Sequence, residues 1–149
     1  MREIKFRAWD TIEKRMWTVV GIEWHTDTVY LRDDTHCVQE RMLHKMTLMP
    51  FTGLYDKNGT EIYEGDIVEK IYGDREGHIK VNGSIKPFLY FVEEKYGCSG
   101  ITPMFPELIH PDDRRWIPIY DQEDEELKTE YLTIVGNIYE NPELFGDNR

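Results

Sequence analysis

Four side chains in the first third of the sequence are of types that bind transition metals: His25, His36, Cys37 and His44. Imidazole and thiolate groups suit zinc, but the spacing of these residues fits no zinc-finger pattern. His36 and Cys37 are adjacent, so both would have to point their side chains at one ion. We therefore predict no metal site here and expect ordinary polar and packing roles for the four residues.

A second candidate ion site is Asp56-Lys57-Asn58-Gly59, which matches part of a calcium-binding loop. Calcium loops carry a further oxygen donor at an alternating position before the glycine, and a bidentate glutamate beyond it. Both are missing from this segment. Its composition is instead typical of a tight turn, and we predict a turn.

The signatures of common enzyme classes are absent from the sequence. It contains no GxGxxG, no GxxxxGKS or GxxxxGKT, no HExxH, no GxSxG and no CxxC. In an enzyme of an unfamiliar type, the candidate catalytic groups would be Asp66, His78 or Glu93 near a cleft. We predict that the protein is not an enzyme, with no catalytic residue, no metal and no cofactor.

Charge is unevenly distributed along the chain. The net charge is −11 at pH 7, and residues 121–149 hold nine acidic and two basic side chains, a net charge of −7. Five carboxylates lie within residues 121–126, and like charges so close together favour a solvated loop. The alternative is a contact surface for a basic partner. An acidic balance also works against nonspecific binding to nucleic acids or membrane surfaces.

Basic residues near the start of the chain are interleaved with tryptophans: Lys5, Arg7, Lys14, Arg15, Trp9 and Trp17. Cations beside aromatic rings are what a phosphate-binding and base-stacking site requires. Both tryptophans fit a hydrophobic core equally well. Nucleic-acid binding by this basic strand is therefore an alternative hypothesis for the function.

Tyrosines are numerous for a chain of this length: Tyr55, Tyr63, Tyr72, Tyr90, Tyr96, Tyr120, Tyr131 and Tyr139. Tyrosine joins an apolar ring to a polar tip, which suits protein interfaces. It equally suits a barrel core whose hydroxyl groups reach the rim, and we prefer that interpretation.

The N-terminal third has the pattern of short strands. Residues 4–9 begin with alternating apolar and basic side chains, which is typical of a strand with one buried face. Residues 16–24 and 29–31 are rich in β-branched and aromatic side chains, with a turn at 25–28. These segments predict a three-stranded meander. Between residues 37 and 46 a short helix fits, and a loop or a strand fits nearly as well.

Turn residues divide the middle of the chain. Asn58-Gly59 between apolar segments predicts a hairpin, and Glu64-Gly65-Asp66 predicts a second turn. Strands are expected at residues 67–72 and 78–81, with reversals at 73–77 and 82–83. Residues 88–92 are apolar throughout, as in a strand buried on both faces, and a loop is expected at 97–100.

Four prolines between residues 101 and 118 predict a loop with at most one helical turn. An edge strand at 116–120 and a last strand at 131–139 complete the series. Frequent turn signals without strand–helix repeats predict a mostly β fold with little helix, built as a small barrel or sandwich. We see no internal repeat or low-complexity linker, and predict a single unit over residues 1–149.

The sequence also bears on location. No stretch approaches the ~18 consecutive apolar residues that cross a bilayer, and the start lacks the apolar run of a secretion signal. Cys37 and Cys98 are too few for a disulfide framework, so we expect reduced thiols and a cytoplasmic protein of the bacterial host.

Three segments resemble the YopX family of proteins from phages and from prophages of Gram-positive bacteria. They are REIKFRAWD at residues 2–10, LMPFTGLYDKNGTEIYEGDIV at 48–68 and IVGNIYENPEL at 134–144. They occur in the family's order and span nearly the whole chain. Pro50 departs from the usual glutamine and Tyr55 from the usual lysine. Because proline cannot donate a ladder hydrogen bond, Pro50 puts the pairing of its strand in doubt.

The resemblance implies a partly open SH3-like β-barrel over residues 48–145, preceded by N-terminal strands in residues 1–47. It supplies no activity. Physically, these motifs consist of turn residues: glycines at bends, Asp56 and Asn58 closing a turn, and Asn141-Pro142 ending a strand and opening a short helix.

We therefore expect a non-enzymatic phage or prophage accessory protein that binds another protein through its barrel rim or its acidic segment at residues 121–126. The alternative is a nucleic-acid-associated protein that uses the basic N-terminal strand. No membrane is implied, and a homo-oligomer is compatible with the sequence.

Overall fold

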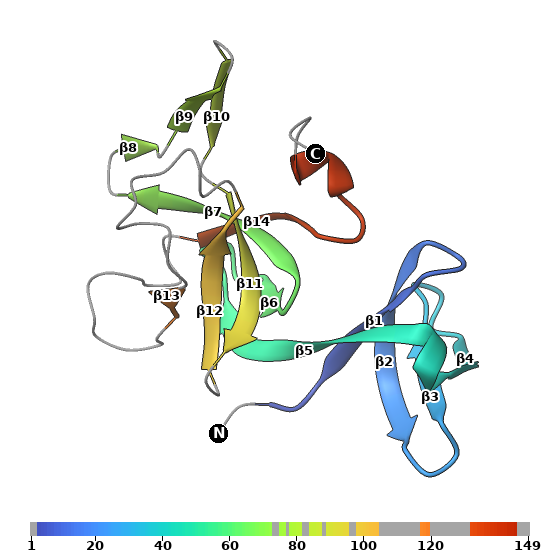
Figure 1. The fold of residues 1–149 in the computed structure, drawn as a ribbon. Coiled ribbons are helices and arrows are strands. Elements are labelled where there is room, and N and C mark those ends of the chain that lie inside the picture. Colours follow the sequence, from blue (N-terminus) through green and yellow to red (C-terminus); the bar gives the residue numbers. More distant parts are fainter. Residues whose placement is uncertain are drawn as a thin grey trace. The chain divides into compact units, whose positions relative to one another are not determined.

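The computed structural model describes residues 3–72, 75–76, 78–81, 84–87, 89–95, 98–104, 117–119 and 132–145. Over these residues the chain is built of antiparallel strands, with two short 3-10 helices (Figure 1). The mostly β fold predicted from the sequence is confirmed. The chain divides into two compact units, Met1–Phe51 and Thr52–Arg149, and the boundary falls within one long strand, β5 (Met46–Tyr55).

The first unit is a sheet of consecutive antiparallel strands. Its elements are β1 (Phe6–Asp10), β2 (Arg15–Glu23), β3 (Thr28–Arg32), β4 (Val38–Met42), the 3-10 helix η1 (Leu43–Lys45) and the first part of β5. The strand order is β4-β3-β2-β1-β5, so β5 returns to pair with β1 and β4 lies at the edge. The predicted three-stranded meander is confirmed, and it continues into β4. Residues 37–46, where a helix, a loop and a strand all fitted, form a strand followed by one helical turn.

One face of this sheet carries the core of the first unit. Trp17 lies opposite Ala8 in the β1–β2 register, and both are buried together with Val29 and Leu31. In β3 the two buried positions alternate with half-buried or exposed ones, because successive side chains of a strand point to opposite faces, whereas in β1 Ala8, Trp9 and Asp10 are buried in succession. Pro50 lies within β5 opposite Phe6, and the next residue donates its N–H to the Lys5 carbonyl (2.9 Å). The strand therefore tolerates proline at this position.

The second unit contains the end of β5 and a larger set of strands. They are β6 (Glu61–Tyr63), β7 (Asp66–Tyr72), β8 (Arg75–Glu76), β9 (His78–Val81), β10 (Ser84–Pro87), β11 (Leu89–Lys95), β12 (Cys98–Pro103), β13 (Ile117–Pro118) and β14 (Leu132–Asn137), followed by the 3-10 helix η5 (Pro142–Phe145). β6 pairs with β5, β9 pairs with β10, and the main sheet has the order β13-β12-β11-β7-β14. The predicted strands at 67–72, 78–81 and 131–139 are confirmed within one or two residues.

A single hydrophobic cluster lies among the strands of the second unit. It contains Leu54, Ile62, Val68, Tyr90, Val92, Ile101, Ile119 and Leu132. Two backbone hydrogen bonds join the β5–β6 hairpin to the main sheet around this cluster: Lys57 N–H to the Leu132 carbonyl (2.9 Å) and Gly65 N–H to the Val92 carbonyl (2.8 Å). Over the described residues, neither sheet closes on itself.

A loop was predicted at residues 97–100 and again from residue 101 onward. This prediction is wrong for residues 98–103, which form β12. Ile101 in this strand is fully buried, and β12 pairs with β11 over six residues. Pro103 is the last residue of the strand, and β13 pairs only with Gly100 and Ile101 on the other side. Proline is tolerated there because no ladder bond on the β13 side requires its N–H. The rest of the proline-rich loop, residues 105–116, and the acidic segment at 121–126 lie outside the described residues.

Candidate functional site

Asp56 is the centre of the turn that was considered as a calcium loop. Its Oδ1 accepts the backbone N–H groups of Asn58 (2.8 Å) and Thr60 (2.9 Å), and its Oδ2 accepts that of Ile134 in β14 (3.1 Å). Gly59 follows with a φ of +79°, a left-handed conformation that glycine adopts at little cost. Both carboxylate oxygens are thus engaged by the backbone. The segment is a turn, as predicted, and it also anchors the last strand.

Asp66 performs a similar role in the next turn. It is 1% exposed, and its Oδ2 accepts the Tyr63 N–H (2.8 Å). Gly65 between them has a φ of +90°, and its carbonyl accepts the Ile138 N–H (3.0 Å). Asp66, considered above as a catalytic candidate, is therefore a buried residue that closes a turn.

The chain after β14 is held by two asparagines. Asn137 Oδ1 accepts the N–H groups of Tyr139 (3.0 Å) and Glu140 (2.8 Å), while Asn141 Oδ1 accepts the Asn137 N–H (3.1 Å). Gly136 lies so close that a Cβ added there would meet Asn141 Cγ at 2.7 Å. The short helix predicted to begin at Asn141-Pro142 is confirmed as η5, whereas the strand ends earlier than predicted, at Asn137.

The four candidate metal ligands do not form one cluster. His44 pairs with Asp27 through Nδ1 and also donates its backbone N–H to Asp27 Oδ1 (3.2 Å). His36 has a φ of +64° in an exposed turn, and Cys37 beside it is exposed. Over the part of the chain that the structure describes, no three His, Cys, Asp or Glu side chains gather in a metal-binding group.

The other catalytic candidates also have structural partners. Glu93 binds the Thr102 hydroxyl across the β11–β12 pair and forms an ion pair with Lys95 (2.7 Å). His78 begins β9, and its side chain lies outside the described set. Nearby, burial and the neighbouring Glu94 carboxylate raise the pKa of Glu64.

Several residues of the basic N-terminal segment interact with other residues of the protein or are buried within it. Lys5 pairs with Glu3 (3.4 Å) and lies over the Phe51 ring (4.6 Å). Trp9 and Trp17 are buried in the first unit, which leaves their rings inaccessible for base stacking. Nucleic-acid binding by this strand stays an untested prediction.

The tyrosines serve more than one role. Tyr90 is buried in the hydrophobic cluster of the second unit, and the Tyr63 hydroxyl donates to Glu61 (2.8 Å). Tyr55 is exposed. Tyr72, Tyr96, Tyr120 and Tyr131 have side chains outside the described set. The described tyrosines thus support both interpretations made from the sequence.

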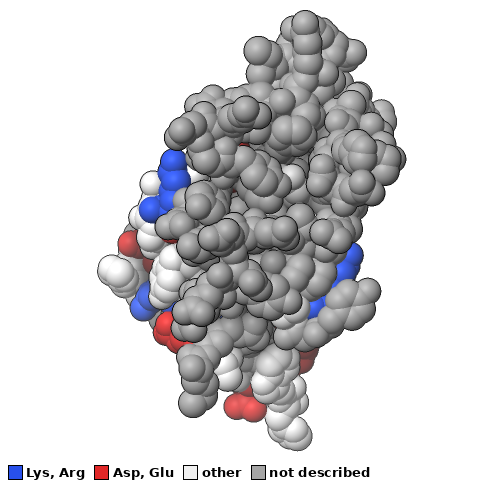
Figure 2. All heavy atoms as spheres, turned by 90° about the vertical axis from the view of Figure 1, so that its left-hand side faces the viewer, with Lys and Arg blue, Asp and Glu red and all other residues white. Residues whose placement is uncertain are grey.

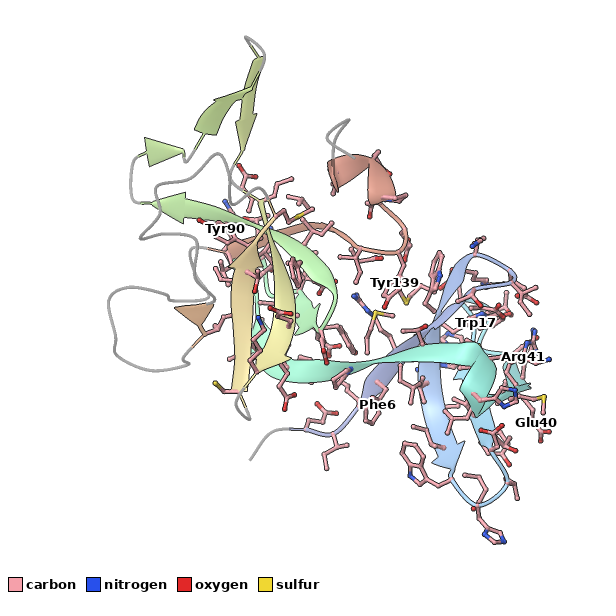
Figure 3. The ribbon with its side chains drawn as sticks, viewed as in Figure 1. Phe6, Trp17, Glu40, Arg41, Tyr90 and Tyr139 are labelled. Carbon is pink, nitrogen blue, oxygen red and sulfur yellow. The ribbon has the colours of Figure 1, made fainter. Side chains whose placement is uncertain are left out.

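A cluster of charged residues surrounds the Trp17 ring at one end of the first unit. The guanidinium groups of Arg15 (4.0 Å) and Arg41 (5.7 Å) lie over the ring. Arg41 also binds Glu13 (3.2 Å) and Gln39 (2.7 Å) through Nη2. In Figure 3, Trp17, Arg41 and Glu40 lie close together beside β4. Arg41 therefore holds the edge strand β4 to the turn between β1 and β2.

Beside this cluster lies a pocket of about 280 Å³, lined by the β1–β2 turn and by residues 40–46. Asp10 in its wall is 5% exposed, and Oδ1 of Asp10 accepts the N–H groups of Ile12 (2.8 Å) and Glu13 (3.0 Å). Ile12 and Met42, which also line the pocket, are 75% and 50% exposed. The lining thus combines three acidic residues, Asp10, Glu13 and Glu40, with the basic Arg41 and Lys45, and charged groups beside exposed apolar side chains are suited to binding a polypeptide.

The sequence analysis did not single out this surface. Exposed apolar side chains continue from Met42 to Val38 (56% exposed) along β4, in positions that alternate with half-buried ones. The alternation was visible in the sequence, but not which face meets solvent. Where described residues are visible in Figure 2, basic and acidic side chains are interspersed and do not gather by sign. The apolar edge of the first unit is thus its more distinctive feature.

No described helix has the length and apolar character needed to cross a membrane. Together these features define a class: an antiparallel β protein whose tight turns are fixed by aspartate and asparagine side chains. The sequence matches the family described as YopX protein over residues 5–146. The chain belongs to the YopX family, as its three motifs indicated.

A crystal structure of protein EF1440 from Enterococcus faecalis is similar to this chain. The similarity has a TM-score of 0.57 at 22% sequence identity, and covers 97% of this chain and 99% of the other. At that identity the likeness concerns the fold. Curated proteins gave no match.

Proposed function

We propose that this protein is a non-enzymatic accessory protein of phage or prophage origin that binds another protein through its first unit. The observation that carries the proposal is the exposure of Ile12 and Met42, which line the pocket, together with the exposure of Val38 at the other end of β4. Contiguous apolar side chains rimmed by charged ones are typical of protein interaction sites. The proposed phage or prophage origin rests on the family resemblance, and the cytoplasmic location that we propose rests on the sequence, whose two cysteines are too few for a disulfide framework.

The roles of the carboxylates support a non-enzymatic function. Both oxygens of Asp56 and Oδ2 of Asp66 accept backbone N–H groups, and Oε1 of Glu93 accepts from Thr102 and pairs with Lys95. A general acid or base needs a free oxygen beside a bound substrate. Carboxylates that fix turns and pair across strands contribute to stability instead.

For the second unit we propose a partly open SH3-like barrel, as the family resemblance implies. Support comes from the single hydrophobic cluster and from the hydrogen bonds at Lys57 and Gly65, which join the β5–β6 hairpin to the main sheet. A small barrel buries one central cluster in this way. An experimental structure in which the two sheets pack as separate layers would contradict this proposal.

Affinity capture tests the protein-binding function. The immobilised full chain would be exposed to lysate of a Gram-positive bacterium that carries a YopX prophage, alongside an Ile12→Lys, Met42→Lys double variant. Val135→Lys is the matched control, because Val135 is an exposed apolar residue of the second unit. We expect the wild type and the control to capture the same protein, and the double variant to lose it. Capture of nothing by the folded wild type, or equal capture by all three, would refute the proposal.

A further inference from the structure

Among the strands that the structure describes, β4 lies at an open edge of the first unit's sheet. It pairs with β3 over five consecutive residues and lies at the end of the strand order. An edge strand presents backbone N–H and C=O groups on its outer side to any extended chain. Proteins often block such edges with proline, lysine or a bulge. β4 has the sequence VQERM and a regular register, so it carries no proline, lysine or bulge, and its two charged residues are Glu40 and Arg41.

The exposed face of β4 has a definite chemical pattern. Val38, Glu40 and Met42 are all exposed and lie at alternate positions, so their side chains share one face. An acidic group thus stands between two apolar ones. The complementary strand would present a basic side chain between two apolar ones, because directly opposite side chains interact across a strand pair.

The positive charge of β4 is already neutralised. Arg41 lies on the other face of the strand, bound to Glu13 and Gln39 and over the Trp17 ring. Within the described residues, Glu40 has no ion pair. The pocket at the end of β4 adds the buried carboxylate of Asp10. The lining of that pocket also includes Arg41, which is bound to Glu13, and Lys45, so the exposed negative charge on β4 itself is that of Glu40, in a chain whose net charge is −11.

We propose that β4 binds an extended segment of a partner protein by strand addition, and that this segment carries lysine or arginine between two apolar residues at alternate positions. The proposal rests on the protein-binding function proposed above and names the kind of partner. Main-chain hydrogen bonds would supply affinity, and Glu40 with its apolar neighbours would supply selectivity.

A second copy of this chain fits the edge less well. Two β4 strands that pair antiparallel with full overlap would place Glu40 of one copy directly opposite Glu40 of the other. Like charges directly opposite each other destabilise a strand pair. The charge pattern therefore favours a basic partner strand over self-association.

Selection from a displayed library of random peptides tests the proposal. The full chain would be immobilised, and the enriched sequence made as a synthetic peptide for titration against the isotope-labelled chain. We expect enrichment of a basic residue with apolar residues two positions to each side, and chemical-shift changes at the amides of residues 38–42. Enrichment of acidic or purely apolar peptides, or no enrichment, would overturn the proposal.

Charge reversal supplies the matched comparison. Glu40→Arg should weaken binding of the selected peptide about tenfold, because an attraction becomes a repulsion. Glu23→Arg is the control, since Glu23 is exposed near the end of β2, two strands from the edge, and should change affinity by less than about twofold. Equal effects of the two variants would overturn the proposal.

The two proposals fail in different ways. If Glu40→Arg captures the lysate partner as well as the wild type does, protein binding stands and strand addition at β4 is refuted. If the wild type captures no partner, the proposed function itself fails. Sedimentation that finds a wild-type dimer, converted to a monomer by Val38→Lys, would identify a second copy as the occupant and overturn the inference.

Discussion

Two aspartates, one in each unit, close turns with the same kind of hydrogen bond but in different surroundings. Asp33 Oδ1 in the first unit accepts the N–H of Thr35 (2.8 Å), the hydroxyl of Thr35 (2.5 Å) and the N–H of Cys37 (3.3 Å). All of these partners lie within four residues, and the turn is exposed. Asp56 in the second unit also accepts three hydrogen bonds, but it is buried and one bond reaches Ile134, 78 residues away.

This contrast extends to the units as wholes. In the second unit, buried polar side chains hold the β5–β6 turn to β14 and fix the chain that follows β14, beside the hydrophobic cluster. Two of the three family-like segments, residues 48–68 and 134–144, meet at Asp56 and Gly65. In the first unit, the Asp33 turn is fixed locally, Arg41–Glu13 and His44–Asp27 connect exposed or half-buried groups, and apolar side chains are exposed along β4. The difference is that two of the three family-like segments form a buried junction in the second unit, whereas the surface that we propose for binding lies in the first.

The largest effect is expected from Asp56→Ala. The substitution leaves three backbone N–H groups without their acceptor in a buried site, and we expect a loss of about 2–4 kcal/mol in the free energy of unfolding. Denaturant titration of the full chain measures it. Asp33→Ala removes as many hydrogen bonds from an exposed turn, where water replaces them, so its loss should be much smaller. Equal losses in the free energy of unfolding for the two variants would contradict the difference that we infer between the units.

Glycines in the two units give the next test. Gly136→Ala would place Cβ 2.7 Å from Asn141 Cγ and 3.0 Å from Leu144 Cδ1. Because Asn141 accepts the Asn137 N–H, its side chain cannot move away without losing that bond. We expect a cost of about 1–3 kcal/mol in the free energy of unfolding.

Gly21→Ala in the first unit is the control for that substitution. An added Cβ would meet Tyr30 Cδ2 at 3.3 Å, and the half-buried Tyr30 ring can shift by the few tenths of an ångström required. Its cost should stay below about 1 kcal/mol. A larger loss for Gly21→Ala than for Gly136→Ala would show that the first unit is the more tightly packed.

Local turn chemistry was predictable from the sequence. The hairpin at Asn58-Gly59, the turn at Gly65 and the start of the short helix after Asn141 all depend on residues within a few positions of one another. The mostly β fold followed from these turns and from strand-like segments between them. Each of these signals is contained in a short window, so a single sequence is enough to show it.

Long-range features were not predictable in the same way. Nothing near Asp56 in the sequence indicates that Ile134 donates its N–H to Oδ2 of Asp56. Nothing near Pro103 indicates that this proline is the last residue of β12, where its missing N–H costs no ladder bond with β13. The candidate binding site depends on β4 being an edge strand, which only the order of strands decides. Exposure of Met42 follows from that order and not from its neighbours.

The smallest expected effects are differences in pH dependence. The Thr35 hydroxyl that donates to Asp33 lowers the pKa of that carboxyl, whereas burial, followed by the Glu94 carboxylate, raises the pKa of Glu64. A lowered folded-state pKa gives stability that is present above the unfolded value and is lost as pH falls through the folded value. A raised pKa gives stability that is present below the unfolded value and is lost as pH rises through the folded value.

Asp33→Asn and Glu64→Gln should therefore respond to pH with opposite signs. Relative to the wild type, Glu64→Gln should gain stability as pH rises from the ordinary glutamate pKa to the raised one, because the variant carries no charge to bury. Asp33→Asn should lose relative stability as pH rises from the lowered pKa to the ordinary aspartate value. Denaturant titrations from acidic to neutral pH measure both. In a Glu94→Gln background the gain at Glu64 should shrink, since one source of its raised pKa is gone; an unchanged gain would leave burial as the sole cause.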